Sequence, residues 1–114
     1  MTRSGQTVDK MLTQYQEAAN KTRDRNPNIA NEWADKLLKI YRKLRESEEG
    51  RTALTTLLSD PSPDVRGWAA THVLGWAPEL GRPVLEKLRD SKGRRSFDAE
   101  IVLREFAKGK LSFD

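Results

Sequence analysis

The sequence predicts an all-α protein of about six helices, and three observations lead to this fold class. Apolar residues recur every three or four positions along most of the chain, which is the spacing that places side chains on one face of a helix. No segment alternates apolar and polar residues with a period of two, so the pattern indicates no strand. Serine, proline and glycine interrupt the apolar pattern as they do at helix starts and stops. We expect helices at about residues 7–21, 28–45, 48–59, 63–77, 79–90 and 97–108.

The first two expected helices form an N-terminal pair over residues 7–46. Thr7 has a side chain suited to capping the first helix, and Trp33 belongs to the apolar stripe of the second. Lysines of the second helix lie four residues from acids, as Lys36 does from Glu32. Such pairs stabilise a helix by about 0.2–0.5 kcal/mol each, so we interpret this face as solvated rather than as a nucleic-acid stripe.

The later helices begin and end at residues with known capping chemistry. Ser47, Ser62 and Ser96 are expected as N-caps, Pro63 at a first helical position, and Gly109 as a C-terminal stop. Pro83 has no amide hydrogen, so we expect the fifth helix to start late or to bend there. The tail after Gly109 holds Leu111 and Phe113, and it is expected to fold back onto the helices.

Residues 57–75 resemble a HEAT repeat. This segment has a leucine-rich first helix, an Asp60-Pro61 turn, the sequence Asp-Val-Arg, a pair of alanines and a final Leu-Gly. The alanines allow two helices to approach closely, and Arg66 is expected to hydrogen-bond acidic or carbonyl groups of the turns. The resemblance implies a short HEAT-like α-α superhelix of about six helices.

A weaker copy of this pattern follows about 32 residues later, a shorter period than the roughly 40–47 residues usual for HEAT units. In this register Val65 matches Phe97, and Ala69 matches Ile101. The bulkier residues of the second copy suit a terminal cap that seals the core. We therefore expect a single domain, 1–114, made of an N-terminal helix pair 7–46, a HEAT-like pair 47–77 and a degenerate capping pair 78–109.

A wider set of positions carries a second resemblance. These positions are Arg51, Leu54, Leu57, Leu58, Asp60, Pro61, Val65, Arg66, Ala69, Ala70, Ala77, Pro78, Glu79, Leu85, Leu88, Leu103, Phe106 and Gly109, with Asn31 in the second helix. Together they resemble an uncharacterised bacterial family of short HEAT-like proteins, a domain family of unknown function. The match is best over residues 51–111, and Pro83 departs from the alanine-rich helix of the family. The resemblance implies a fold and a bacterial cytoplasmic origin, and it implies no activity.

The residue inventory argues against an enzyme. With no cysteine and one histidine among 114 residues, the chain has nothing to supply thiolate catalysis, cysteine-bound zinc or a two-histidine mechanism. That histidine, His72, lies four residues from both Trp68 and Trp76, and all three are expected in the core. No apolar run is long enough to cross a bilayer, and no signal peptide begins the chain. We expect no catalytic residue, no metal, no cofactor, no membrane partner and a cytoplasmic location.

Two groups of residues are candidates for binding. Lys92, Arg94 and Arg95 lie in a glycine-containing loop ahead of the last helix, where loop and helix dipole together favour an anion such as phosphate or sulfate. A solvated loop is the plainer interpretation of the same three residues. Arg66, Thr71 and Arg104 are predicted to line a groove that contacts a partner, although Arg66 also suits a structural role in the turns.

The leading hypothesis is a non-catalytic protein-binding module whose partner is another protein or a peptide. A narrower version is an immunity- or antitoxin-like inhibitor of a bacterial protein, which rests on size and fold alone. The alternative is binding of nucleic-acid backbone on a basic concave face. The net charge of +4 is compatible with both, and the alternative requires Lys36, Lys39, Lys92, Arg94, Arg95 and Arg104 to converge. The sequence does not decide between oligomeric states.

Overall fold

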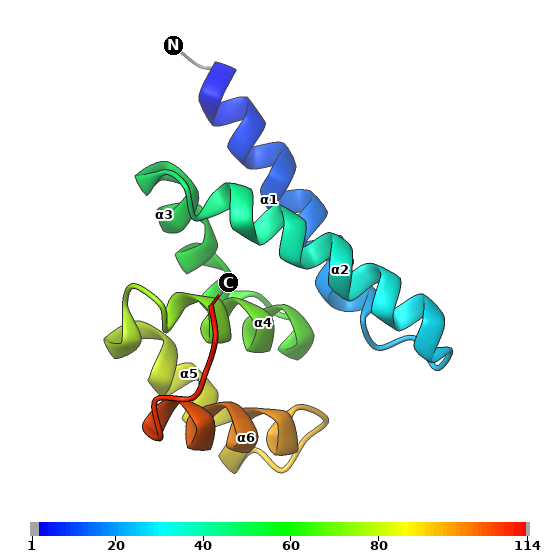
Figure 1. Cartoon of the computed structure of the whole chain (residues 1–114), viewed down its shortest axis with the longest axis vertical. Helices are drawn as coiled ribbons and strands as arrows, with labels where there is room; N and C mark the ends of the chain where they lie inside the picture. Colours follow the sequence, from blue (N-terminus) through cyan, green and yellow to red (C-terminus); the bar gives the residue numbers. More distant parts are fainter. Residues whose placement is uncertain (1–2, 114) are drawn as a thin grey trace. The chain divides into compact units, whose positions relative to one another are not determined.

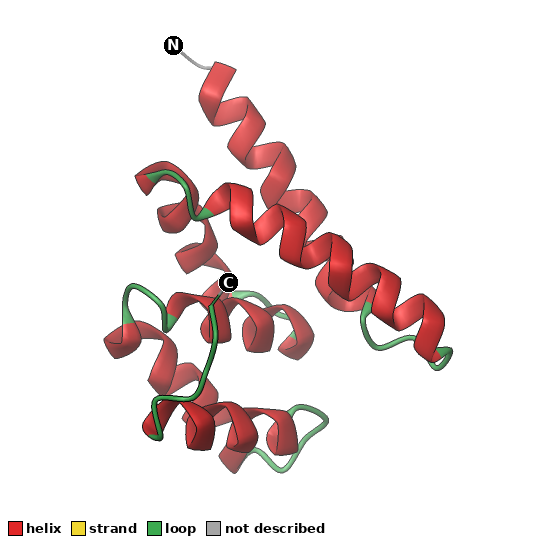
Figure 2. Cartoon of the chain, viewed as in Figure 1, coloured by secondary structure: helices red, strands yellow, loops and turns green. Residues whose placement is uncertain are grey.

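The computed structural model describes residues 3–113, with side chains described for residues 7–113. Six α-helices and one 3-10 helix make up the secondary structure of the described residues, which contain no strand (Figure 2). The prediction of an all-α protein with six helices is therefore confirmed. The chain divides into two compact units, Met1–Thr56 and Leu57–Asp114, and each is described by itself below.

The first unit contains three helices, α1 (Arg3–Lys21), α2 (Pro27–Leu44) and α3 (Glu48–Thr56) (Figure 1). The helices α1 and α2 pack against each other, and α3 contacts both of them. The start predicted at Thr7 is wrong, because α1 begins about one turn earlier, at Arg3. A capping side chain favours a helix start without enforcing it, and no proline before Thr7 stops the helix from extending. A cap that we did not predict starts α2, where the Asn26 side chain accepts a hydrogen bond from the Asn28 amide.

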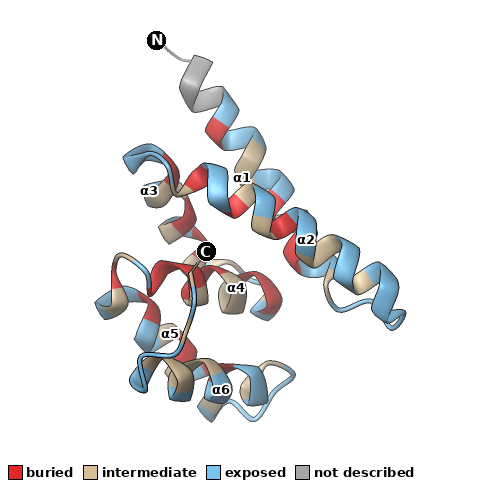
Figure 3. Ribbon diagram, in the orientation of Figure 1, coloured by how far each residue is buried: buried red, intermediate tan, exposed pale blue. Residues whose placement is uncertain are grey.

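Two tyrosines lie at the centre of the first unit. Tyr15 of α1 is fully buried and Tyr41 of α2 is nearly so, together with Ala18, Ala19, Leu37, Leu44 and Leu54 (Figure 3). Burial, followed by the neighbouring Tyr41, raises the pKa of Tyr15 well above its ordinary value of 10.0. A phenol in this environment stays protonated because its anion would lose hydration.

The joint between α2 and α3 depends on a glycine. The Ser47 side chain accepts a hydrogen bond from the Gly50 amide at 2.9 Å, which confirms Ser47 as the N-cap of α3. At Gly50 a Cβ atom would lie 1.9 Å from the carbonyl oxygen of Leu44, a distance no side chain tolerates. The backbones of the two helices therefore approach as closely as they do because this residue has no side chain.

Lys36 contacts a different partner from the one predicted. The Nζ atoms of Lys36 and Lys21 lie 4.2 and 4.5 Å from the centroid of the Trp33 ring. Lys36 thus contacts the indole rather than Glu32, the acid four residues before it. The negative face of an indole attracts an ammonium group, and it does so without ordering a second long side chain.

The second unit contains the 3-10 helix η1 (Leu57–Ser59), α4 (Pro63–Val73), α5 (Pro78–Asp90), α6 (Ser96–Ala107) and the C-terminal segment. The middle helix, α5, packs against both α4 and α6 (Figure 1). The core cluster of this unit consists of Ala70, Leu74, Leu85, Leu88 and Ala99, and partly buried apolar residues of η1, α5, α6 and the C-terminal segment pack against it. Gly81 brings α5 close to α4, since a Cβ there would lie 2.6 Å from the Ala70 carbonyl oxygen.

Several predicted boundaries of the second unit are confirmed. Ser62 caps α4 by accepting a hydrogen bond from the Val65 amide, with Pro63 at the first helical position. The last helix, α6, stops at Gly109, which has a φ of 70°, and the amides of Gly109 and Lys110 bond the carbonyls of Phe106 and Glu105. This pattern is the Schellman motif, which favours glycine because the residue after the C-cap, here Gly109, has a left-handed backbone.

Two boundary predictions of this unit are wrong, and one is confirmed. The fourth helix was expected to reach residue 77, but α4 ends at Val73, and Ala77, the residue before Pro78, has a non-helical backbone. The fifth helix, expected over residues 79–90 with a late start or a bend, is confirmed as α5 over Pro78–Asp90, which contains Pro83 without starting late. Ser96 is not the N-cap of α6 but its first residue, and its hydroxyl donates to the Arg89 carbonyl.

The C-terminal tail packs on the core of the second unit, as expected from its two large apolar residues. Leu111 and Phe113 are partly buried against the core cluster, and the Phe113 ring lies at Gly75. The HEAT-like arrangement of the helices stays a prediction, as does the single domain 1–114. The division between the units falls inside the expected pair 47–77, with α3 in one unit and α4 in the other.

Candidate binding surfaces of the second unit

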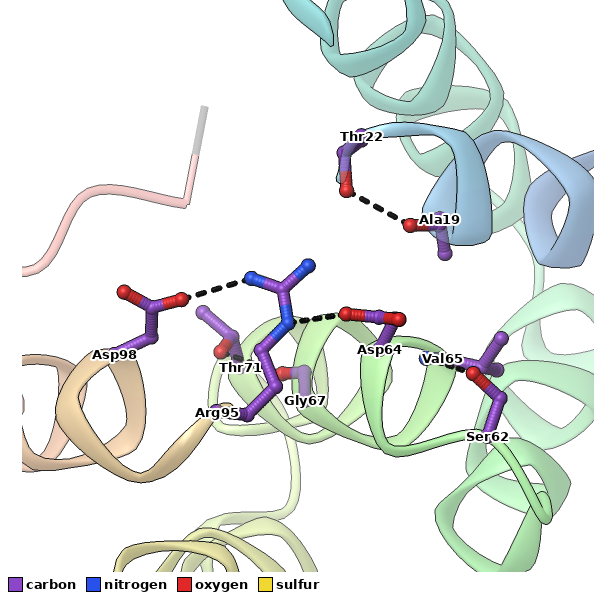
Figure 4. A network of polar contacts seen from close by, with 9 residues as sticks. All are labelled: Ala19, Thr22, Ser62, Asp64, Val65, Gly67, Thr71, Arg95 and Asp98. Carbon is purple, nitrogen blue, oxygen red and sulfur yellow. Dashed lines mark hydrogen bonds and ion pairs between the residues drawn. The ribbon is translucent and has the colours of Figure 1, made fainter. Parts of the chain in front are cut away.

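An ion pair connects α4 to the start of α6. Arg95, just before α6, donates from Nε to Oδ1 of Asp64 at 2.5 Å and from Nη1 to Oδ2 of Asp98 at 2.8 Å (Figure 4). The Asp64 side chain is fully buried in the first turn of α4, whereas the Asp98 side chain is 57% exposed. Burying a carboxylate costs several kcal/mol unless a cation and hydrogen bonds compensate it, so Arg95 is the residue that makes Asp64 tolerable there.

An apolar pocket lies between α4 and α6 above α5, and its volume is about 340 Å³. We call it the apolar pocket. It is lined by Gly67, Trp68 and Thr71 of α4, Leu85 and Leu88 of α5, Ala99, Ile101 and Val102 of α6, and the Arg95–Asp98 pair. The pocket is open partly because Gly67 has no side chain: a Cβ there would meet only Leu88, at 3.8 Å.

Large apolar side chains are exposed next to this pocket. Phe97 is 68% exposed and Ile101 is 37% exposed, one helical turn apart on α6. The corresponding positions in α4, Val65 and Ala69, are fully buried. Of the bulky residues expected in a capping helix, Phe97 and Ile101 do not cover the core, whereas Val102 and Phe106 pack against it and Ala99 is buried. The apolar positions of α6 are divided between the core side and an open face.

A second pocket, of about 640 Å³, has a basic lining, and we call it the basic pocket. Four cationic residues and no carboxylate are among its lining residues, which are Leu58, Ser59, Pro63, Arg66, Val84, Lys87, Leu88, Ser91, Gly93, Arg94 and Arg95. The residues come from η1, the start of α4, the second half of α5 and the loop before α6. Segments up to 37 residues apart in the sequence thus meet at one concave surface.

The three residues predicted to contact a partner do not share one surface. Arg66 donates from Nη1 to the carbonyls of Asp60 and Pro61, at 2.7 and 3.0 Å, and lines the basic pocket. Thr71 lines the apolar pocket, with its hydroxyl bonded to the Gly67 carbonyl. Arg104 is half-exposed on α6, forms an ion pair with Glu100 at 3.2 Å and lines neither pocket.

Two of the three residues predicted to bind an anion lie at the same pocket. Arg94 and Arg95 both line the basic pocket, although Arg95 also pairs with Asp64 and Asp98. Lys92 has a φ of 59° and lines neither pocket. Lys87 is a basic-pocket residue that sequence reasoning missed. Its position in the last turn of α5 suggested only a favourable interaction with the helix dipole.

His72 is buried, as expected, and its ring centroid lies 5.8 Å from that of Trp68. Trp68 and Trp76 are half-buried rather than fully enclosed in the core, and Trp68 lines the apolar pocket. Within residues 3–113 no group of three or more histidine, aspartate or glutamate side chains is placed to hold a metal ion. No described helix combines the length and the apolar character needed to span a membrane.

These features define an all-α protein with two concave surfaces on one three-helix unit. The chain matches no family model and no curated protein. Among solved structures it is similar to the protein RPA1889 from Rhodopseudomonas palustris CGA009. The crystal structure of that protein matches with a TM-score of 0.84 at 23% sequence identity, over 92% of each chain. This likeness shows the fold.

Proposed function

We propose that this chain is a non-catalytic protein-binding module and that its second unit holds an amphipathic helix of a partner protein. The observation that carries the proposal is the exposure of Phe97 and Ile101 beside the apolar pocket. Exposure of two large apolar side chains to water is unfavourable. A partner that covers them lowers the free energy of the complex by about 25 cal/mol for each Å² of apolar surface buried. Exposed apolar surface next to a concavity is typical of interaction sites.

The charges around the apolar pocket favour an apolar anchor in the partner. Asp64 and Asp98 both pair with Arg95, so this cluster beside the pocket carries one excess negative charge. An anionic group entering the pocket would lose its hydration and meet that charge, and a cationic group would find both carboxylates already paired with Arg95. A leucine-, methionine- or phenylalanine-like side chain loses nothing by the same transfer, and a pocket of about 340 Å³ has room for it.

The shape of the site favours a helix as the carrier of this anchor. Residues of α4, α5 and α6 all line the pocket, and α5 packs against both of the other helices. An amphipathic helix presents apolar side chains at positions i and i+4, which matches the spacing of Phe97 and Ile101 along α6. We include in this proposal the HEAT-like stacking of the helices, a bacterial cytoplasmic setting, and an immunity- or antitoxin-like inhibitor as the narrower form.

Nucleic-acid backbone binding, the alternative from the sequence, has less support. Three of the six residues that it requires are engaged elsewhere: Lys36 contacts Trp33, Arg95 pairs with Asp64 and Asp98, and Arg104 pairs with Glu100. Each such contact reduces the charge available for phosphates.

Site-specific cross-linking tests the proposal. A photoreactive amino acid in place of Ile101 is introduced in the source cells, and the cross-linked peptide is identified by mass spectrometry. We expect one partner protein, cross-linked through an amphipathic helical segment. A synthetic peptide of that segment should then bind the purified chain, measured by calorimetry.

Three variants decide whether the peptide uses the apolar pocket. Gly67→Leu fills the pocket and Phe97→Asp places a charge on its rim, so each should weaken binding by about 30-fold or more. Leu80→Asp is the matched control, because Leu80 is 46% exposed on α5 and lines neither pocket. Equal binding by Gly67→Leu, or a cross-link to a second copy of the chain, would contradict the proposal.

A further inference from the structure

The basic pocket concentrates positive charge in a way that the rest of the second unit does not. Over Leu57–Asp114 the charges almost balance, with ten Lys and Arg against nine Asp and Glu. Four of those ten cations line this one pocket, and none of the carboxylates between residues 57 and 113 does. A concave surface with cations and without counter-charges has a positive potential that attracts anions.

Two of the four cations have no competing partner. Within the part of the chain that the structure describes, the side chains of Lys87 and Arg94 form no ion pair or hydrogen bond. Arg66 is held in place differently, by the carbonyls of Asp60 and Pro61, which accept from its Nη1 and leave its charge uncompensated. Arg95 is the exception, since Asp64 and Asp98 neutralise it. The effective cations are therefore Arg66, Lys87 and Arg94.

The two helix ends at this pocket have opposite effects on the binding of an anion. The N-terminal residue of α4, Pro63, lies in the wall, and the positive end of a helix dipole favours an anion. The C-terminal end of α5 would disfavour one, but the Ser91 hydroxyl donates to the Leu88 carbonyl at 2.7 Å and Lys87 lies in the same turn. The electrostatic potential in the pocket is therefore determined mainly by the charged side chains that line it.

We propose that the basic pocket binds a small phosphorylated organic molecule through a phosphomonoester dianion. A phosphomonoester carries nearly two negative charges at pH 7 and presents three acceptor oxygens, which suits two guanidinium groups and one ammonium group. The pocket also has an apolar part, formed by Leu58, Val84 and Leu88, which gives the organic portion of the ligand a surface to contact. The site differs from the loop site expected from the sequence, because Lys92 is absent and Arg66 and Lys87 are added.

Calorimetry with phenyl phosphate as the probe tests this site, and it does not depend on the proposed partner protein. We expect one molecule to bind per chain, and inorganic phosphate to bind more weakly because it lacks the apolar group. Lys87→Ala and Arg94→Ala should each weaken phenyl phosphate about 10-fold, since each removes one charge-assisted contact. Neither side chain has a hydrogen bond or ion pair to lose within the described residues, so both variants should fold normally, which circular dichroism checks.

Lys108→Ala is the matched control, because Lys108 is an exposed cation at the end of α6 and lines neither pocket. Equal binding of phenyl phosphate by the wild type and by both pocket variants would overturn the proposal, as would no binding at all. A short DNA duplex is the second probe. Tighter binding of DNA that collapses with salt and weakens equally in Lys108→Ala would show a diffuse nucleic-acid surface instead of this pocket.

Discussion

The two units fill their interiors with residues of different size. The first unit, Met1–Thr56, centres on the buried rings of Tyr15 and Tyr41. The core cluster of the second unit, Leu57–Asp114, consists of Leu74, Leu85 and Leu88 with Ala70 and Ala99, and it contains no aromatic ring. Large rings occupy the space between helices, whereas smaller side chains leave part of that space to be filled by other residues. Both pockets described above lie on the unit whose core cluster has no ring.

The largest expected effect comes from removing the ion pair between Arg95 and Asp64, which connects the start of α6 to α4. In Arg95→Ala the Asp64 carboxylate stays buried without its cation, which should lower the free energy of unfolding by about 3 kcal/mol. Urea denaturation measures the loss. Hydrogen exchange should place the reduced protection in α4 and α6. A loss of protection in α1 and α2 of the same size would contradict the contrast between the units.

Arg89→Ala is the control for this experiment. Arg89 also forms an ion pair, with Asp90 at 2.9 Å, but both side chains are exposed. The hydrogen bond from Arg89 holds the pKa of Asp90 below its usual value. Solvent screens an exposed pair and the side chains lose entropy in forming it, so we expect no measurable change in stability.

The second prediction compares the glycine joints of the two units. Gly50→Ala should cost about 3 kcal/mol and Gly81→Ala about 2 kcal/mol, because the added Cβ overlaps backbone carbonyls at 1.9 and 2.6 Å. Gly67→Ala is the control, with ordinary contact at 3.8 Å, and it should stabilise α4 by up to about 1 kcal/mol. Denaturation of the three variants gives the order. A smaller cost for Gly50→Ala than for Gly67→Ala would show that α3 shifts freely against α2.

The smallest effect appears only at alkaline pH and belongs to the first unit. Because burial raises the folded-state pKa of Tyr15 above 10.0, the unfolded chain loses this proton first as pH rises. The contribution of Tyr15 to stability is therefore complete below pH 10 and decreases above it. Relative to Tyr15→Phe, the wild type should lose up to about 1.4 kcal/mol per pH unit in that range. A constant difference between the two proteins from pH 8 to about pH 11 would show that Tyr15 titrates normally.

Local chemistry predicted the boundaries that are set within one helical turn. Ser47 and Ser62 bond amides three residues ahead, and Gly109 takes the left-handed conformation that ends α6. Each of these depends only on neighbouring residues, so one sequence is enough to see them. The start of α1 was missed because helices extend beyond a possible cap when nothing stops them.

The candidate surfaces depend on contacts that no local pattern encodes. Arg95 was predicted either to contribute to an anion site in its loop or to be solvated, but it pairs with Asp64, 31 residues earlier. This contact depends on the packing of α4 and α6 against α5. Lys87 reaches the basic pocket for the same reason. Phe97 and Ile101 were recognised as apolar, but periodicity shows only that they share a face and does not show whether anything covers it.

The two glycine joints have a consequence for tracing distant relatives of this chain. At Gly50 and Gly81 a single hydrogen atom is all that the opposing carbonyl admits, whereas most apolar core positions accept another residue of similar volume. A chain that shares this fold at an identity as low as 23% is therefore best aligned at these two positions first. The leucines around them can be replaced by other apolar residues. A side chain at either glycine can be accommodated only if one helix shifts relative to its neighbour.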